Sequence, residues 1–272
     1  MQTDTLLSRA ISRSAVARLH KAYHDEPDPL HATQAEVVRY VAALQQADRA
    51  LAHAQEATAA TATNTSPSDA EAALLQRRRK SVDTAIARQG WLAARRAGSD
   101  RQASLATLNA IFNLGTAPET PMDGDYRGEL LTPTLFGPLD SAGRFLARLW
   151  LPWKGKRFDS AASSGYNYLT RGGHIGGRLV WPLYNRWSRA GHGLYRYFNF
   201  KTSTGPAVND PGVTALKLDY NLPENPGLIV RLVLDELVQV SGGYYLGKAY
   251  LRSRGGKYRL AAYFTLHDEE IV

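Results

Sequence analysis

Residues 244–266, with the sequence YYLGKAYLRSRGGKYRLAAYFTL, contain two strand-like runs joined by a short turn. The runs Tyr244–Arg252 and Lys257–Leu266 are rich in Tyr, Phe and Leu, and aromatic side chains are favoured in strands. The turn between them contains Gly255 and Gly256, and glycine accepts the positive φ that a tight hairpin turn requires. This stretch therefore predicts an antiparallel hairpin.

The sequence before this hairpin has the same character. Short runs rich in Tyr, Phe, Leu and Val are separated by Gly, Pro, Asn and Asp; they are Tyr195–Lys201, Ala215–Tyr220, Ile229–Leu234 and Glu236–Val240. Several short strands at this spacing are typical of a closed or nearly closed antiparallel barrel. We therefore predict a β-barrel domain over residues 118–272, with its β-rich part running from about Gly124 to Leu266.

Residues 1–117 predict a separate helical region instead. Val37, Val41 and Leu44 share one face of a helix predicted over Thr33–Glu56, since they recur at three- and four-residue steps. Residues 57–70 are small and polar and include Pro67, which indicates a loop or flexible linker.

Two more helices are expected in this region. Ser68 and Glu71 have the spacing of a capping box, which predicts a second helix that runs to about Arg96. A shorter helix at Leu105–Leu114 ends before Gly115, a C-cap residue. The predicted fold class is therefore α+β, with an N-terminal helical region followed by an antiparallel, lipocalin-like β-barrel.

The composition of the chain excludes several kinds of functional site. The chain has no cysteine, which excludes disulfides, thiolate metal sites and a cysteine nucleophile. We see neither a secretory signal nor a run of about 20 apolar residues, so a cytoplasmic location is expected. The net charge of +8 is uneven: Arg144–Lys201 holds eleven basic residues and one acid, a formal +10.

Two motifs near the start of the barrel resemble a known family. Gly124–Gly128 has the form G-x-aromatic-x-G, and Trp153–Phe158 reads W-x-G-K-x-F. Together they are similar to the GXWXG-motif family and, more distantly, to the opening strand of lipocalin-type barrels, although Tyr126 stands where Trp is expected. The resemblance implies a barrel but no particular reaction. A large ring at Tyr126 is expected to close one end of the barrel rather than to act as a catalytic phenol.

The histidines predict no metal site, because none of them has a suitable ligand pattern around it. His174 and His192 lie in the glycine-rich stretches RGGHIGG and RAGHG, which we interpret as loops. Either could ligate haem or carry a proton, and the alternative is an exposed loop histidine.

A buried acid is expected within the run LVLDELVQV. Neighbouring side chains of a strand face opposite sides, so either Asp235 or Glu236 points into the barrel. An inward carboxylate needs a cationic partner. The candidates are Lys201, Lys217, Lys248 and Arg231. The carboxylate could orient a ligand or belong to a structural ion pair, and the sequence leaves both open.

The basic and aromatic segment has three interpretations. Phe145–Trp153 could be an interfacial element, with Arg144, Arg148, Lys154 and Lys156 at anionic head groups. The aromatic residues that follow could stack on single-stranded nucleic acid, but we recognise no nucleic-acid module. The third interpretation places these rings in the barrel core and its rim.

We therefore expect a cytoplasmic protein, with possible peripheral contact with an anionic membrane, that binds a hydrophobic, anionic small molecule such as a fatty acid, lipid or polyketide-like compound. The predicted pocket residues are Tyr126, Trp153, Lys201, Tyr220, Glu236 and Tyr245. The alternatives are a barrel enzyme, an isomerase, cyclase or hydratase that uses an inward Asp or Glu, and a haem-binding barrel.

Overall fold

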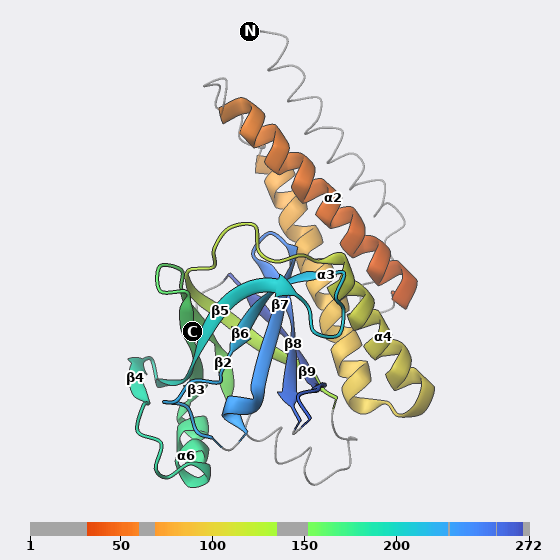
Figure 1. Cartoon of the computed structure of the whole chain (residues 1–272). Helices are drawn as coiled ribbons and strands as arrows, with labels where there is room; N and C mark the ends of the chain where they lie inside the picture. Colours follow the sequence, from red (N-terminus) through yellow and green to blue (C-terminus); the bar gives the residue numbers. More distant parts are fainter. Residues whose placement is uncertain (1–31, 60–68, 135–151, 228, 254, 269–272) are drawn as a thin grey trace. The chain divides into compact units, whose positions relative to one another are not determined.

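The chain divides into two compact units, Met1–Gln89 and Gly90–Val272. The computed structural model describes residues 32–59, 69–134, 152–227, 229–253 and 255–268. Helices come first and a closed antiparallel barrel follows, which confirms the predicted α+β class (Figure 1). Helix α4 (Gly98–Leu114) groups with the barrel in the second unit, whereas the sequence analysis placed all residues before 118 with the helical region.

The first unit contains α2 (Gln34–Ala59) and most of α3 (Asp69–Arg95). Thr33 and Glu36 form a capping box at the start of α2, where the Glu36 carboxylate accepts from the Thr33 amide at 2.7 Å. The predicted apolar stripe of α2 is buried, and Arg79 of α3 pairs with Asp48 of α2 at 2.8 Å. Residues 57–59 continue α2, and the predicted capping box at Ser68 lies outside the described residues.

Nine strands form one sheet in the described residues, and all their pairings are antiparallel. They are β1 (Gly124–Pro133), β2 (Trp153–Asp159), β3 (Ser164–Thr170), β4 (Ser188–Gly191), β5 (Leu194–Pro206), β6 (Thr214–Asp219), β7 (Val233–Ser241), β8 (Tyr244–Arg252) and β9 (Tyr258–His267). The order β3-β2-β1-β9-β8-β7-β6-β5 closes on itself because β3 also pairs with β5. Eight strands therefore make the barrel, and β4 adds a short hairpin to β5.

The predicted C-terminal hairpin is confirmed. Strands β8 and β9 pair from Tyr244 opposite His267 to Arg252 opposite Tyr258, with a one-residue register shift between Ala249 and Tyr250. Gly256 in the turn has a φ of 75°, the positive value for which the sequence analysis expected a glycine.

Two local predictions are wrong. Ile229–Leu234 is not one strand, because a 3₁₀ turn at Val230–Leu232 precedes β7 and Ile229 has a φ of 67°. The stretch RGGHIGG is not a loop either; it lies in α6 (Arg171–Val180), beside β3 and β5 (Figure 1). The Thr170 hydroxyl accepts from the amide of Gly173 and caps this helix, despite its poor intrinsic propensity.

Three glycines inside the barrel each lie under an aromatic ring. A Cβ atom at Gly128 would lie 2.3 Å from the Trp153 ring, and one at Gly247 would lie 2.2 Å from the Phe264 ring. Gly165 has the same relation to Phe200, with a separation of 2.4 Å. These distances are far below van der Waals contact, so the rings fill space that any other residue would occupy.

Helix α4 covers part of the outer barrel surface within the second unit. Its Leu108, Ile111 and Phe112 are fully buried. Gly115 follows the helix as predicted, but its φ of −80° is not left-handed. Glycine is needed there for a different reason, since a Cβ would lie 2.6 Å from Val238 of β7.

We expect Gly128→Ala to destabilise the second unit by about 1–3 kcal/mol, the usual cost of overpacking a core. The added methyl group would collide with the Trp153 ring. Urea unfolding followed by tryptophan fluorescence measures the change.

Gly212→Ala is the matched control, because a Cβ there meets open space and its φ is not positive. Equal losses in the two variants would contradict the proposed role of Gly128.

Candidate functional site

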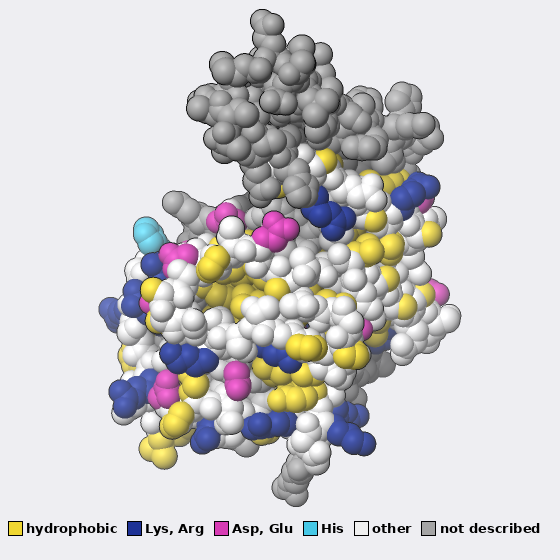
Figure 2. Space-filling model, turned by 45° about the horizontal axis from the view of Figure 1, so that its top comes forward, with side chains coloured by type: hydrophobic (Ala, Val, Ile, Leu, Met, Phe, Trp, Pro, Cys, Tyr) yellow, Lys and Arg dark blue, Asp and Glu magenta, His cyan; other side chains and the backbone are white. Residues whose placement is uncertain are grey.

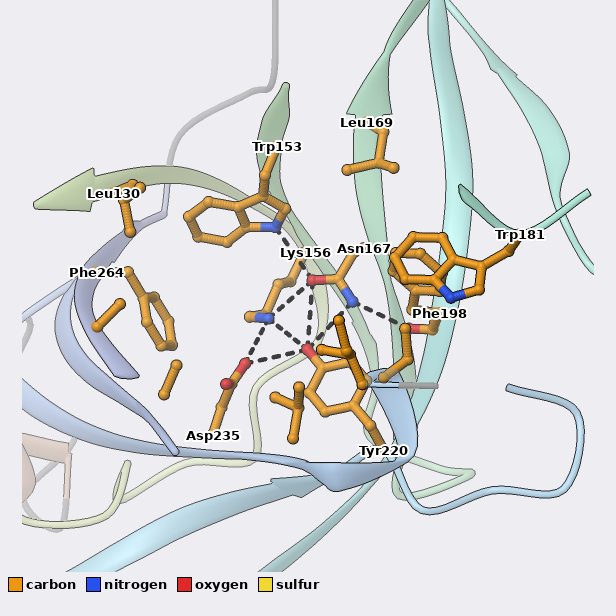
Figure 3. Close-up of a pocket in the computed structure, with 15 residues that line it drawn as sticks. Leu130, Trp153, Lys156, Asn167, Leu169, Trp181, Phe198, Tyr220, Asp235 and Phe264 are labelled. Carbon is orange, nitrogen blue, oxygen red and sulfur yellow. Dashed lines mark hydrogen bonds and ion pairs between the residues drawn. The ribbon is translucent and has the colours of Figure 1, made fainter. Parts of the chain in front are cut away.

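The barrel contains a cavity of about 110 Å³ that is partly open to solvent. Its wall is mostly apolar and aromatic and includes Trp153, Trp181, Phe198 and Phe264 (Figure 3). Four polar groups converge on the cavity: Lys156 of β2, Asn167 of β3, Asp235 of β7 and Tyr220, which directly follows β6. An apolar hollow with a few converging polar groups is the usual form of a small-molecule site.

Asp235, and not Glu236, faces the barrel interior. Asp235 pairs laterally with Leu218 of β6 and Ala249 of β8, and Ala249 also lines the cavity. Glu236 pairs with Lys217 and Lys248 on the outer face.

The inward carboxylate forms a buried ion pair with Lys156. The Lys156 Nζ atom lies 2.8 Å from Asp235 Oδ2, and the two side chains are 3% and 6% exposed. Nζ also donates to Asn167 Oδ1 at 2.8 Å and to the Tyr220 hydroxyl at 2.5 Å. All three ammonium protons therefore have acceptors.

The remaining hydrogen bonds hold these partners in place. The Tyr220 hydroxyl donates to Asp235 Oδ2 at 3.1 Å and accepts from Asn167 Nδ2 at 3.1 Å. Asn167 Nδ2 also donates to the carbonyl of Phe198 at 3.0 Å, and the Trp153 indole N–H donates to Asn167 Oδ1 at 3.1 Å. Among the described residues, none donates a hydrogen bond to Asp235 Oδ1. This oxygen therefore keeps its acceptor capacity with respect to the described residues.

Burial controls the protonation of the cluster. It lowers the pKa of Lys156, and the charge and hydrogen bond of Asp235 oppose that shift. Burial, followed by the negative charge of Asp235, raises the pKa of Tyr220 well above its usual value, so the phenol stays protonated at neutral pH. Four aromatic rings, those of Trp153, Phe200, Tyr220 and Phe264, have centroids 5.2–5.5 Å from the ammonium nitrogen. The ammonium thus has a carboxylate and several π faces around it.

A break in strand alternation explains why Lys156 points inward. The register of β2 against β3 shifts between Trp153 and Gly155, and Gly155 has a φ of 150°. The irregularity places Trp153, Lys156 and Phe158 on the same inner side. The interpretation of Lys156 as a residue at lipid head groups is therefore wrong, because it lies inside the barrel.

The two resemblance motifs lie side by side, since Tyr126 of β1 pairs with Lys156 of β2. Tyr126 is buried, and its ring makes edge contacts with Phe158 and Tyr245 at centroid distances of 5.4 and 5.7 Å. The first motif thus supplies part of the core beside the cavity.

The structure brings only part of the predicted pocket together. Trp153 and Tyr220 line the cavity, whereas Tyr126 and Tyr245 belong to the same core cluster without being among the described lining residues. Lys201 is exposed and donates to the carbonyl of Ala162 at 3.3 Å. Glu236 lies on the opposite face of the sheet.

Neither His174 nor His192 is among the described residues that line the cavity. His174 stacks on Tyr195 with a centroid distance of 4.0 Å, and its Nδ1 lies 2.9 Å from the Tyr197 hydroxyl. His192 is exposed in the turn between β4 and β5, where it and Gly193 both have positive φ.

Sequence reasoning missed Lys156 and Asn167 as cavity residues. The run W-x-G-K-x-F offered one signal, because Lys156 and Phe158 are two residues apart and so share a strand face. Asn167 alternates with Gly165 and Leu169 in the same way.

Most of the proposed interfacial element, residues 145–151, lies outside the described residues. No helix in the described part of the chain is long and apolar enough to cross a membrane.

The chain matches no family model, and comparisons with curated proteins and with solved structures give no match either. The resemblance to the GXWXG-motif family therefore stays a prediction, whereas the closed antiparallel barrel is established by the strand pairing.

We expect Lys156→Met to lower the free energy of unfolding by about 3–5 kcal/mol, because Asp235 would remain buried without its cation. The double variant Lys156→Met/Asp235→Leu should recover most of that loss. Urea unfolding of the two variants tests this, and equal losses in both would show that the charge of Asp235 is not the cause.

Glu236→Gln should change the pH dependence of stability. Burial raises the pKa of Glu236 above its usual 4.5, so the native state holds this proton more tightly than the unfolded state does. The resulting stabilisation is present below that usual value and is lost as pH rises through the native pKa. Each tenfold difference in proton affinity corresponds to about 1.4 kcal/mol.

We therefore expect the free energy of unfolding of Glu236→Gln, relative to that of wild type, to be higher at pH 7 than at pH 4. A stability difference that is independent of pH would contradict this role of Glu236.

Proposed function

We propose that the barrel binds a small, uncharged and largely apolar molecule that carries one polar group. The observation that carries this proposal is the cavity in which Asp235 Oδ1 lacks a donor among the described residues while aliphatic side chains and aromatic rings form most of the wall. A hydroxyl group placed there could donate to that oxygen and leave its apolar body against the rings (Figure 3).

The size of the cavity favours a ligand with a single ring. An engineered apolar cavity of about 150 Å³ accepts benzene, and this one has about 110 Å³ and is partly open. A fatty acid or polyketide would have most of its length outside. The cavity thus supports a smaller ligand than the sequence predicted.

The charges of the site favour a neutral ligand over the predicted anionic one. The Lys156 ammonium already has three acceptors, one of them the Asp235 carboxylate. An anion would have to displace one of them and would add an uncompensated charge to a buried site.

Benzyl alcohol and toluene form a matched pair of probes. We expect benzyl alcohol to bind about tenfold more tightly, since a net hydrogen bond to a charged group is worth about 1.5–3 kcal/mol and part of that is lost in desolvating the hydroxyl. NMR titration of the protein with each compound measures both affinities.

Two variants locate the binding. Ala262→Leu should abolish it by filling the cavity, whereas Val233→Ala enlarges the same space and should preserve it. Binding that survives Ala262→Leu would place the ligand elsewhere and overturn the proposal.

A further inference from the structure

We propose that Lys156 is a nucleophilic amine that forms a Schiff base with a small aldehyde or ketone in the cavity. This rests on the proposed function, since it assigns a carbonyl group to the ligand of the same site. Its Nζ atom borders the cavity and is surrounded by aromatic walls. Lysines desolvated in apolar pockets are the ones that serve as Schiff-base amines.

The neighbours of Lys156 supply the proton transfers that the reaction needs. A nucleophilic amine must lose one proton, and Asp235 at 2.8 Å is the acceptor within reach. The Asp235 carboxyl group takes this proton at Oδ2 and could donate it to the carbonyl oxygen of a ligand in the cavity. Burial lowers the pKa of Lys156, which favours the loss of its proton.

The reaction balances without any further reagent. The amine nitrogen forms a bond to the carbonyl carbon, and the π electrons move to the oxygen, which takes the proton from Asp235. The resulting hydroxyl group leaves as water when it receives the second proton, which comes from nitrogen. Protonated amine plus carbonyl compound thus gives iminium plus water, with no oxidation or reduction.

The product preserves the electrostatics of the site. The iminium carries one positive charge at the former amine nitrogen, and Asp235 is again a carboxylate beside it. The buried pair therefore remains neutral overall before and after the reaction, so no uncompensated charge is created inside the barrel.

The experiment uses benzaldehyde, which differs from benzyl alcohol only in the oxidation state of its polar carbon. The full-length protein is incubated with benzaldehyde, reduced with borohydride and digested with a protease that does not cut at lysine. Mass spectrometry should find a benzyl group on Lys156 at least tenfold more often than on exposed Lys154, which is the internal reference on the same strand. An excess of benzyl alcohol should suppress the Lys156 adduct alone.

The outcomes separate the two proposals. Benzyl alcohol binding without preferential labelling of Lys156 would overturn the covalent inference and leave the binding function standing. If benzyl alcohol does not bind and Lys156 is not preferentially labelled, the proposed binding function is overturned as well. Because the adduct is located by mass in the unmodified protein, the result does not depend on whether Lys156→Met folds.

A second inference comes from α6, whose apolar residues face outward. Gly173 and Gly177 form its buried side, and a Cβ at Gly173 would lie 2.5 Å from Pro152. Ile175 and Leu179, one helical turn apart, are 54% and 80% exposed, and Leu183 just beyond the helix is 95% exposed. An ordinary surface helix buries its aliphatic side instead.

The sequence around these aliphatic side chains is basic, although the charge of Glu224 acts on Tyr184 next to Leu183. No acidic residue occurs in residues 160–209, which contain Arg171, Arg178, Arg186, Arg189, Arg196 and Lys201. Burial lowers the pKa of His174 in α6, and the positive charges of Arg178 and Arg189 lower it further. The lower part of the face in Figure 2 shows basic and apolar side chains with some acidic ones among them.

We infer that α6 and the segment up to Leu183 dock onto an anionic lipid surface. Aliphatic side chains flanked by arginines match an interface in which acyl chains lie beneath negatively charged head groups. The phosphates of a nucleic acid would attract the arginines, but they would not bury the three exposed aliphatic side chains. Trp181, which follows α6, lines the cavity, so an apolar ligand dissolved in a bilayer would be near the binding site.

Vesicle co-sedimentation tests this surface. The protein should bind vesicles of phosphatidylcholine with phosphatidylglycerol and not those of phosphatidylcholine alone. Leu179→Ser/Leu183→Ser should weaken binding at least tenfold without loss of stability, since both side chains are exposed. Leu114→Ser is the matched control, because Leu114 is 37% exposed at the end of α4, which packs against β7, whereas α6 lies beside β3 and β5, and it should bind as wild type does.

Equal sedimentation of the double variant and wild type would overturn the inference. So would the absence of lipid binding together with retention of a single-stranded oligonucleotide, which would assign the arginines to nucleic acid.

Discussion

The Lys156–Asp235 ion pair spans the interior of the barrel. Strands β2 and β7 are four strands apart in either direction round the closed sheet, so the pair joins opposite walls. Two charges removed from water require close mutual contact and further hydrogen bonds, and Asn167 and Tyr220 supply them. The cavity lies beside this polar contact, which also gives it its acceptor oxygen.

Turn glycines and the alternation of apolar side chains made much of the barrel predictable from the sequence. Glycines indicated the C-terminal hairpin, and the strand predicted at Ala215–Tyr220 is present as β6, with Leu218 and Tyr220 in the barrel core and Leu216 packed against it. Alternation fails wherever the backbone departs from regular strand geometry. Gly155 and Phe198, with φ values of 150° and 50°, are two such positions, and both help to set which side chains enter the cavity.

The candidate site was less predictable because its members are distant in the sequence. Of the cationic partners predicted for the inward carboxylate, Lys217 and Lys248 lie on the strands beside β7, but they approach Glu236 on the outer face. The partner of Asp235 comes from the opposite wall, 79 positions earlier in the chain. Sequence spacing carries no information about contacts across a barrel. In α6, the tertiary contacts of two glycines outweigh their low helix propensity.

The glycines under aromatic rings determine how closely three side chains approach the backbone of the barrel. Trp153, Phe200 and Phe264 lie directly against the backbone at Gly128, Gly165 and Gly247, where any Cβ atom would overlap the ring. None of these three positions accepts a larger residue unless the ring above it moves. At these places the inner wall of the barrel is a single aromatic side chain lying on backbone, so the residue that limits the internal space is the glycine under the ring as much as the ring itself.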